Sequence, residues 1–377
     1  MRTKKRLVSA VAVFAVLGLV AGACGGDDGG TDETDAPSTD APSTDAPSTD
    51  APSTDAPSTD APSTDAPGDG AAVGLLFDVT GRGDKSFNDA AAAGLDQAVT
   101  EFGVVPSEST PTGEGDRAER LAGLIDAGNG LVIGVGFLWG DAITAGSAEN
   151  PETSFAIIDS VVEADNVASL VFAEHEGSFL VGAAAALKSQ TGKVGFIGGV
   201  ENDLIKRFEA GFAAGVAAVD PEIEVLVQYI SQPPDFTGFN DSAKGKEIAA
   251  AMYADGADVV YSAAGASGLG AFQAAQEAAV PGEVWAIGVD SDQYNLVEPD
   301  LQPYILTSML KKVDVAVYQT VKAYAEGTFA AGVTTFDLAA DGVGYSTSGG
   351  FVDDIADQLD EYAAQIIDGT IEVPTAP

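Results

Sequence analysis

The sequence predicts an α/β protein built from two lobes. From residue 71 onward, about 300 residues alternate between short apolar runs of strand length and longer runs of helix length. This alternation is typical of parallel sheets whose strands are joined by right-handed helical crossovers. The strand-like runs are more numerous than one lobe needs, and the segment is long enough for two domains of ordinary size. We therefore expect two lobes, each with its own sheet.

The first 24 residues resemble a lipoprotein signal peptide. A basic stretch, residues 2–6, precedes an apolar run at residues 7–20, which is too short to span a bilayer comfortably. Small residues then lead to Cys24, the only cysteine in the chain. We expect Cys24 to be lipidated after cleavage, although Ala21 replaces the leucine usual in such signals. The alternative is an ordinary secretory signal with a chance cysteine.

Residues 25–70 are predicted to form a disordered tether. The sequence Ala-Pro-Ser-Thr-Asp occurs six times in succession across residues 36–65. These repeats are acidic and proline-rich and have no apolar face to stack, so they do not suit a solenoid. An extended chain of this kind rises ~3 Å per residue and would hold a domain on the order of 100 Å from a membrane.

The charge of the chain excludes one class of partner. The formal net charge is −41, and such a field repels the phosphates of nucleic acids, so we expect no DNA or RNA partner. No later apolar segment approaches the length of a membrane span. We therefore expect a body at the extracytoplasmic face of the cell membrane, held there only through Cys24.

The stretch at residues 73–94 organises the first lobe. An apolar strand is predicted at residues 73–77, followed by a glycine-containing loop and an alanine-rich helix. Ser86 is the expected N-cap, with Asp89 at capping-box spacing. Polar and aromatic residues should therefore gather where the strand ends and the helix begins, which is where open α/β sheets bind ligands. These candidates are Asp78, Asp84, Ser86, Phe87 and Asn88.

The remaining elements follow in alternation. Strands are expected at residues 130–135, 154–159, 167–172, 193–198, 223–230, 258–262 and 284–289, and helices at residues 179–188, 205–219, 243–254, 269–279, 311–327 and 351–367. We expect the chain to cross between lobes near Phe172, Pro303 and Phe329. The first lobe would then comprise residues 71–172 and 303–328, and the second residues 173–302 and 329–377.

Three acidic residues end apolar runs: Asp78, Asp159 and Asp290. A single acid at a strand end is usually a helix cap or a turn former. Three at similar strand ends favour a binding role, in which carboxylates accept hydrogen bonds from hydroxyl or N–H groups of an uncharged polar ligand.

Aromatic and glycine residues supply further candidates. Phe87 could stack on a flat ring, which is worth roughly 1–3 kcal/mol per base in nucleic-acid sites, or serve as a hydrophobic staple for the helix. The second stacking aromatic is left open between Tyr261, Phe137 and Phe239. Gly265, in an alanine- and glycine-rich segment after a strand, would let the backbone approach a ligand, although a tight turn explains it equally well.

Several of these segments resemble one family. The pattern Asp-x-x-Gly-x-x-Asp-Lys-Ser-Phe-Asn at residues 78–88 resembles the signature of the basic membrane protein family, the purine-nucleoside-binding lipoproteins of ABC transport systems. Segments at residues 172–182, 263–271, 289–293 and 307–314 resemble further family segments in the same order. The resemblance implies a type I periplasmic-binding-protein fold, with two Rossmann-like lobes joined by a hinge.

The resemblance also implies roles for individual residues. Phe87 would stack on the base, Asp290 would hold the ribose hydroxyls, and Lys311 would reach the ligand from the hinge side. Thr80, Arg82 and Gly83 differ from the expected loop, which leaves the base preference open. The function expected is that of a monomeric, lipid-anchored binding protein without catalytic residues or cofactor, which hands a purine nucleoside to an ABC permease. His175, the only histidine, has no partner at metal-ligand spacing, so we expect no metal.

Other functions remain as alternatives. Residues 134–140 follow a strand and precede Asp159 by roughly 20 residues, as in dinucleotide-binding enzymes. Their spacing, G-x-G-x-x-x-G, is one residue too long. A hydrolase is disfavoured because Ser86 and Ser267 have no plausible His/Asp arrangement. The same fold could instead bind a sugar, or act as a ligand sensor for a membrane receptor.

Overall fold

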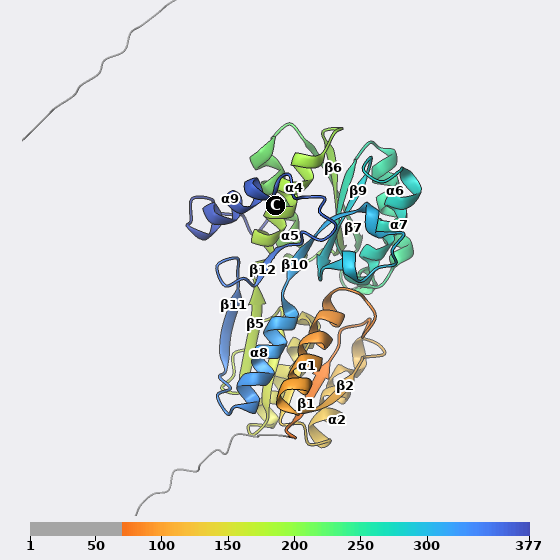
Figure 1. The fold of residues 1–377 in the computed structure, drawn as a ribbon. Coiled ribbons are helices and arrows are strands. Elements are labelled where there is room, and N and C mark those ends of the chain that lie inside the picture. Colours follow the sequence, from red (N-terminus) through yellow and green to blue (C-terminus); the bar gives the residue numbers. More distant parts are fainter. Residues whose placement is uncertain (1–69) are drawn as a thin grey trace, which may run out of the picture. The chain divides into compact units, whose positions relative to one another are not determined.

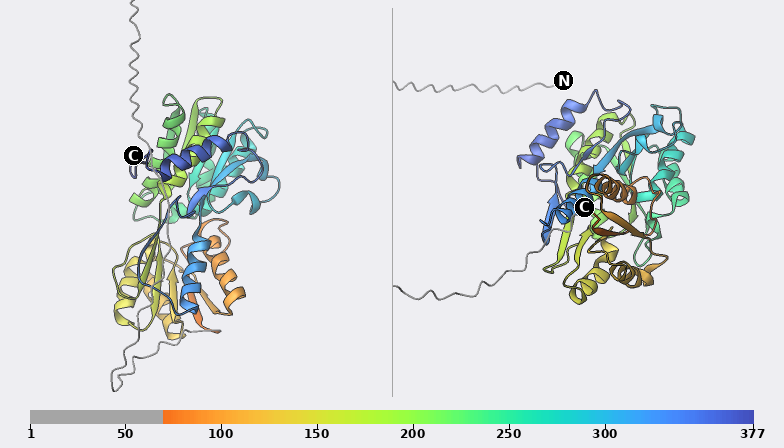
Figure 2. Two further views of the ribbon diagram at one scale, coloured as in Figure 1. Left: turned by 60° about the vertical axis from the view of Figure 1, so that its left-hand side comes forward. Right: turned by 60° about the horizontal axis from the view of Figure 1, so that its bottom comes forward.

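The computed structural model describes residues 70–377, which form two α/β lobes (Figure 1, Figure 2). The predicted signal peptide, Cys24 and residues 25–69 of the predicted tether lie outside the described residues. Among residues 70–377, no helix combines the length and apolar character that a bilayer span requires.

Lobe 1 is built on an all-parallel sheet of strand order β2-β1-β3-β4-β5-β11. Helices α1 and α8 pack together, and α2 packs with α3. Because both faces of the sheet are covered, its central strands read as continuous apolar runs. The strands are β1 (Ala72–Leu76), β2 (Val105–Ser109), β3 (Leu131–Gly134), β4 (Ser154–Ile158), β5 (Val167–Phe172) and β11 (Gly332–Phe336); the helices are α1 (Phe87–Phe102), α2 (Arg117–Asp126), α3 (Gly140–Glu149) and α8 (Val313–Ala325).

Lobe 2 repeats the plan with the order β7-β6-β8-β9-β10-β12, in which only β12 is antiparallel. Helices α4 and α5 pack closely, since a Cβ at Gly182 would lie 2.2 Å from the Phe212 carbonyl oxygen. The strands are β6 (Lys193–Val200), β7 (Glu224–Ser231), β8 (Val259–Ala263), β9 (Trp285–Asp290), β10 (Ile305–Lys311) and β12 (Val343–Tyr345); the helices are α4 (Glu174–Lys188), α5 (Asp203–Val219), α6 (Ser242–Ala254), α7 (Leu269–Ala278) and α9 (Ala356–Ile367).

The two sheets share one topology. In each, the second strand along the chain lies at the edge, followed by the first, third, fourth, fifth and sixth. The strand order reverses between β1 and β3 in lobe 1 and between β6 and β8 in lobe 2. Ligands of such sheets bind at the carboxyl ends of the strands beside this reversal. The topology therefore indicates a ligand site at the loops that follow these strands.

The chain crosses between lobes three times, and two crossings lie further along the chain than expected. The first follows β5, which ends at Phe172. The second follows Lys311 rather than lying near Pro303, because β10 pairs with β9 of lobe 2. The third follows β11 rather than lying near Phe329, because β11 pairs with β5 of lobe 1. Lys311 thus ends a strand and does not begin the helix predicted at residues 311–327.

Candidate functional site

A cavity lies between the two lobes, at the carboxyl ends of strands from both sheets. Its space, including the opening to solvent, is about 590 Å³. Lobe 1 contributes Asp78, Val79, Thr80, Asp84, Phe87, Asn88, Gly136, Phe137 and Asp159 to the lining. Lobe 2 contributes Leu204, Ile205, Phe208, Phe239, Ala263, Gly265, Ala266, Val289, Asp290 and Lys311.

Asp84 caps the first helix through its side chain. Its Oδ1 accepts hydrogen bonds from the backbone N–H groups of Ser86 and Asp89, both at 3.0 Å. Its Oδ2 accepts from the Asn88 N–H at 2.8 Å. The Asp89 carboxylate instead turns back to the N–H groups of Gly83 and Lys85. The expected capping box between Ser86 and Asp89 is therefore wrong: Ser86 stands at the N-cap position but makes no side-chain cap.

Asn88 holds the loop through both the amide nitrogen and the amide oxygen of its side chain. Its Nδ2 group donates to Thr80 Oγ1 at 2.8 Å and to Asp84 Oδ2 at 2.9 Å. Its Oδ1 accepts from the backbone N–H of Asp78 at 2.8 Å. Both Asp84 and Asn88 line the cavity, but their hydrogen-bonding groups are engaged within the loop, so their main effect is to fix its shape.

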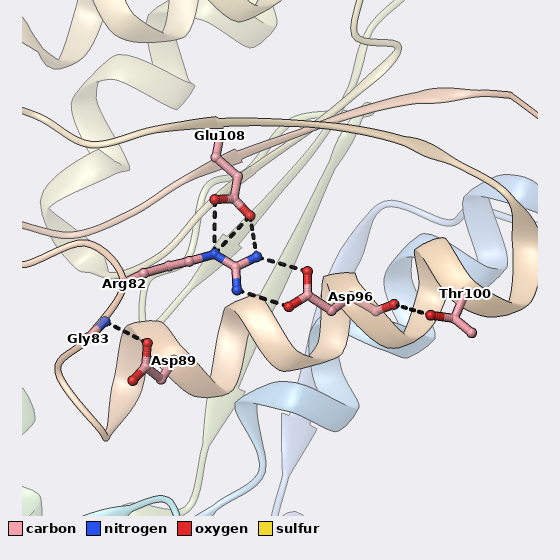
Figure 3. A network of polar contacts seen from close by, with 6 residues as sticks. All are labelled: Arg82, Gly83, Asp89, Asp96, Thr100 and Glu108. Atoms are coloured by element: carbon pink, nitrogen blue, oxygen red, sulfur yellow. Dashed lines mark hydrogen bonds and ion pairs between the residues drawn. The ribbon is translucent and has the colours of Figure 1, made fainter. Parts of the chain in front are cut away.

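Arg82, which does not line the cavity, anchors the same loop. Its guanidinium lies between the carboxylates of Asp96 on α1 and Glu108 on β2 (Figure 3). The bonds to Asp96 are paired, at 2.9 Å from Nη1 and 2.8 Å from Nη2. Such two-pronged pairing matches the planar geometry of both groups. Arg82, one of the residues that differ from the family pattern, therefore ties the loop to its own lobe.

The three strand-end acids predicted from the sequence all line the cavity. The Asp159 Oδ2 atom lies 2.6 Å from Lys311 Nζ, whereas its buried Oδ1 has no hydrogen-bond partner among the described residues. Asp290 accepts a hydrogen bond from Ser86 through Oδ2 at 2.6 Å. Asp78 Oδ1 accepts from the Val79 N–H at 2.8 Å. In these contacts, each acid therefore uses one carboxylate oxygen to bond to the protein.

Burial governs the charge of these acids. It raises the pKa of Asp78 to about 6, against the opposing effects of the Val79 N–H and Arg117. It also raises the pKa of Asp290 to about 6, although Lys311 and the Ser86 hydroxyl favour the ionised form. With pKa values near 6, both groups are mostly ionised at neutral pH and can accept hydrogen bonds there.

The positive charge of Lys311 is balanced by carboxylates of the protein. Its ammonium lies 3.5 Å from Glu174 Oε1 in addition to its contact with Asp159. Burial lowers the pKa of Lys311, but the neighbouring carboxylates outweigh this effect and raise it overall. The ammonium also lies 5.0 Å from the centre of the Phe87 ring, within cation–π range. Lys311 is the only basic side chain among the described residues that line the cavity, so no lining cation is left unpaired.

Aromatic rings from both lobes complete the wall. Phe87 and Phe137 of lobe 1 and Phe239 of lobe 2 line the cavity, as does Phe208, which the sequence analysis missed. Phe208 lies near the start of α5, which follows β6 as α1 follows β1. An aromatic residue in the second turn of the helix that follows a strand-end loop was the signal that could have identified it.

Two predicted site residues do not line the cavity. Tyr261 is fully buried in β8, where its ring packs against Phe196 and Phe212 and its hydroxyl lies 3.3 Å from Ser178 Oγ. It is therefore a core residue, placed there by the alternation of side chains along the strand. Ser86 is also fully buried and reaches the site through its hydroxyl, which lies 2.6 Å from Asp290 Oδ2 and 3.1 Å from the Val289 carbonyl oxygen.

His175 does not belong to a metal-binding cluster within the described residues. Among residues 70–377, no group of three or more His, Cys, Asp and Glu side chains is arranged to hold a metal ion. His175 is partly buried on α4, and burial lowers the pKa of its imidazole.

Comparison with known proteins identifies the sequence relatives. Residues 71–376 match the model of the Bmp family, described as ABC transporter substrate-binding protein PnrA-like. The CD4+ T-cell-stimulating antigen of Listeria monocytogenes is 36% identical over 81% of this chain and 88% of its own length. The ABC transporter nucleoside-binding protein BmpA of Lactococcus lactis is 35% identical over 80% of this chain and 88% of its own length.

Comparison with solved structures identifies the fold. An ABC transporter solute-binding protein from Aeropyrum pernix superimposes with a TM-score of 0.71 and 31% identity, covering 81% of this chain and 93% of that protein. A second, from Conexibacter woesei, gives a TM-score of 0.65 at 20% identity, over 81% of this chain and 99% of that one. The predicted two-lobed, type I periplasmic-binding-protein-like fold is confirmed.

Proposed function

Because the chain belongs to the Bmp family of PnrA-like ABC transporter substrate-binding proteins, we propose that it binds a purine nucleoside between its lobes and delivers it to an ABC permease. The observation that carries this proposal is the composition of the cavity. Acids from both lobes line a space whose walls are otherwise largely aromatic and aliphatic. The relative from Lactococcus lactis is named as a nucleoside-binding protein.

The hydrogen-bonding groups favour a ligand rich in donors. Asp159 Oδ1 is buried without a partner among the described residues, and a buried acceptor left unpaired costs about 1–3 kcal/mol. Ribose hydroxyls and the N–H groups of a base supply donors of the required kind. A phosphate would be disfavoured, because it would face Asp78, Asp159 and Asp290 while Lys311 is already paired.

The aromatic walls favour a flat ring. Phe87, at the start of α1, and Phe208, in α5, approach the cavity from opposite lobes, and both rings lie near the Lys311 ammonium, at 5.0 and 5.7 Å. A purine placed against Phe87 would gain stacking energy, and Phe137 and Phe239 are the further candidates for its second face. A monosaccharide has the hydroxyls but lacks the aromatic ring that would use these walls.

The proposed place of action follows from the N-terminal segment. Lipidation at Cys24 would hold the protein at the extracytoplasmic face of the membrane, and residues 25–70 would let the two lobes reach a permease. Mass spectrometry of the protein purified from membranes tests this directly, since a diacylglyceryl adduct is expected on Cys24. An unmodified mature N-terminus would contradict the anchoring.

A ligand panel tests the binding proposal. We expect inosine, guanosine or adenosine to raise the melting temperature of the purified protein and to bind in calorimetry, because a ligand that binds only the folded state stabilises it. Ribose and glucose serve as sugar controls, and AMP tests the rejection of phosphate. Stabilisation by a sugar with no response to any purine nucleoside would overturn the proposal. Mass spectrometry of the ligand that co-purifies with the protein gives an independent answer.

A further inference from the structure

Two residues of lobe 1, Lys85 and Ser86, form hydrogen bonds with one segment of lobe 2. The Ser86 hydroxyl donates to Asp290 Oδ2 at 2.6 Å, with the Val289 carbonyl oxygen also in range at 3.1 Å, and Ser291 Oγ donates back to the Ser86 carbonyl oxygen at 2.9 Å. The Gln293 side-chain amide donates to the Lys85 carbonyl oxygen at 2.9 Å, and Lys85 Nζ donates to the Leu296 carbonyl oxygen at 2.6 Å. We call these four contacts, between residues 85–86 and residues 290–296, the latch.

Both sides of the latch are held in position by their own lobes. Because Asp84 caps α1, the Ser86 hydroxyl is free to point to the other lobe. On the opposite side, Gln293 Oε1 accepts from the Val289 N–H at 2.9 Å, and the Gln293 N–H donates to Ser308 Oγ at 3.2 Å. Prepositioned groups lose little conformational entropy when they meet, so more of their interaction energy remains for holding the lobes together.

The latch also excludes water at its centre. Ser86 is 0% and Gln293 1% exposed. A hydrogen bond between a hydroxyl and a carboxylate is charge-assisted and stronger than a neutral one, and a low-dielectric setting strengthens it further. The Ser86–Asp290 bond is therefore the strongest candidate among the four contacts for controlling separation of the lobes.

Asp290 connects the latch to the ligand cavity. It lines that cavity and also a second hollow, whose lining includes Ala90, Ser291 and Leu296. Asp290 therefore belongs to the lining of both spaces. A ligand that donates to Asp290 would bind the same carboxylate that Ser86 holds, so occupancy of the cavity and closure of the lobes would share one group.

We propose that the latch controls how long the lobes stay closed, with Ser86 as a positioning residue that acts through Asp290 and does not contact the ligand. Ser86 does not line the cavity, so the proposal gives it a conformational role in place of the direct ligand contact expected from the sequence. The kinetic part of this proposal rests on the proposed function, because it needs a nucleoside that binds. The conformational part does not need any ligand.

Ligand kinetics provide the first test. In Ser86→Ala, we expect a purine nucleoside to dissociate roughly tenfold faster, because a buried charge-assisted hydrogen bond is lost, while the association rate changes little. Ser291→Ala, which removes a less buried contact of the same latch, should give a smaller change in the same direction. Ser169→Ala is the matched control: it removes a fully buried serine of lobe 1 whose hydroxyl bonds only to Val162, and its dissociation rate should equal that of the unaltered protein.

Distance measurements provide the second test, without ligand. Spin labels at Glu119→Cys on α2 and Gln273→Cys on α7, both exposed, report the separation of the lobes when Cys24→Ser removes the native thiol. Adding Ser86→Ala or Ser291→Ala should shift the distance distribution to longer values, and Ser169→Ala should not. Unchanged distances in both latch variants would overturn the proposal. If no purine nucleoside binds the unaltered protein, the proposed function fails, and these distances still decide whether the latch exists.

Discussion

Asp159 and Asp290 occupy the same position in the two lobes. Asp159 directly follows β4 and Asp290 ends β9, each the fourth strand of its lobe along the chain. Both have a left-handed backbone, with φ of 65° and 64°. Such a backbone is uncommon outside glycine, and aspartate is among the residues that tolerate it best. Each turn points a carboxylate into the cavity, where Lys311 holds one acid and Ser86 holds the other.

The pairing of Asp159 with Lys311 leads to a prediction about folding. Lys311→Met should lower the free energy of unfolding by about 3–5 kcal/mol, because it leaves buried carboxylates without their cation. The neighbouring Lys312→Met is the control, since Lys312 pairs with Asp341, whose side chain is 84% exposed, and such pairs contribute at most about 1 kcal/mol. Urea denaturation at pH 7.5 measures both. Equal effects of the two substitutions would contradict a structural role for the buried pair.

A second prediction separates ligand binding from folding at Phe87. Phe87→Ala should weaken purine-nucleoside binding by about 1–3 kcal/mol, the range measured when a stacking aromatic is removed. The cost to folding should be smaller, because this ring faces the cavity and is only partly buried. Phe102→Ala is the matched control at the other end of α1, where the ring packs on Tyr318 with centroids 5.8 Å apart. It should destabilise the fold and leave the affinity unchanged in calorimetry.

The sequence predicted the strand-end acids because their signal is local. An apolar run that stops at an acid identifies the end of a strand, and parallel strands bring such ends to one edge of the sheet. The face of a residue within a strand is less easily predicted. Tyr261 was expected at the site, but the alternation of side chains along β8 places it in the core.

Contacts between residues far apart in the chain also could not be predicted from the sequence. Ser86 and Asp290 are 204 positions apart, and no local pattern links them. The later lobe crossings were misplaced for a similar reason: β11 has four exposed residues out of five, so its sequence lacks the apolar run that identified the buried strands. Its partner, β5, is chosen by tertiary structure, which overrides weak local preference.

A third prediction concerns pH and binding. Affinity for a purine nucleoside should fall as the pH is lowered from 7.5 to 5, because Asp78 and Asp290, with pKa values of about 6, become protonated and lose acceptor capacity. Calorimetry at the two pH values measures this. An affinity that is the same at pH 5 and pH 7.5 would exclude these carboxylates as acceptors for the ligand.

The same acids predict the opposite trend for folding. Burial raises the pKa of Asp290 from 3.8 to about 6, so between these values the folded state binds protons that the unfolded state has released. The contribution of Asp290 to stability is therefore lost as the pH rises through this window. Asparagine also tolerates the left-handed backbone, but it does not titrate, so Asp290→Asn does not lose stability in this way. The stability of this variant relative to the unaltered protein should therefore increase from pH 4 to pH 7. A pH-independent difference in urea denaturation would contradict the shifted pKa.

The last prediction concerns the return of the chain to lobe 1 after β10. Helix α8 packs on α1 (Figure 1). At Gly94 of α1, an added Cβ would lie 2.2 Å from the Asp314 carbonyl oxygen of α8. Gly94→Ala should therefore destabilise the protein by roughly 1–3 kcal/mol through overpacking. At Gly123, in α2, an added Cβ meets no atom within 4 Å, and alanine there should stabilise the helix by up to about 1 kcal/mol. Thermal denaturation that shifted in the same direction for both would contradict the close approach of α1 and α8.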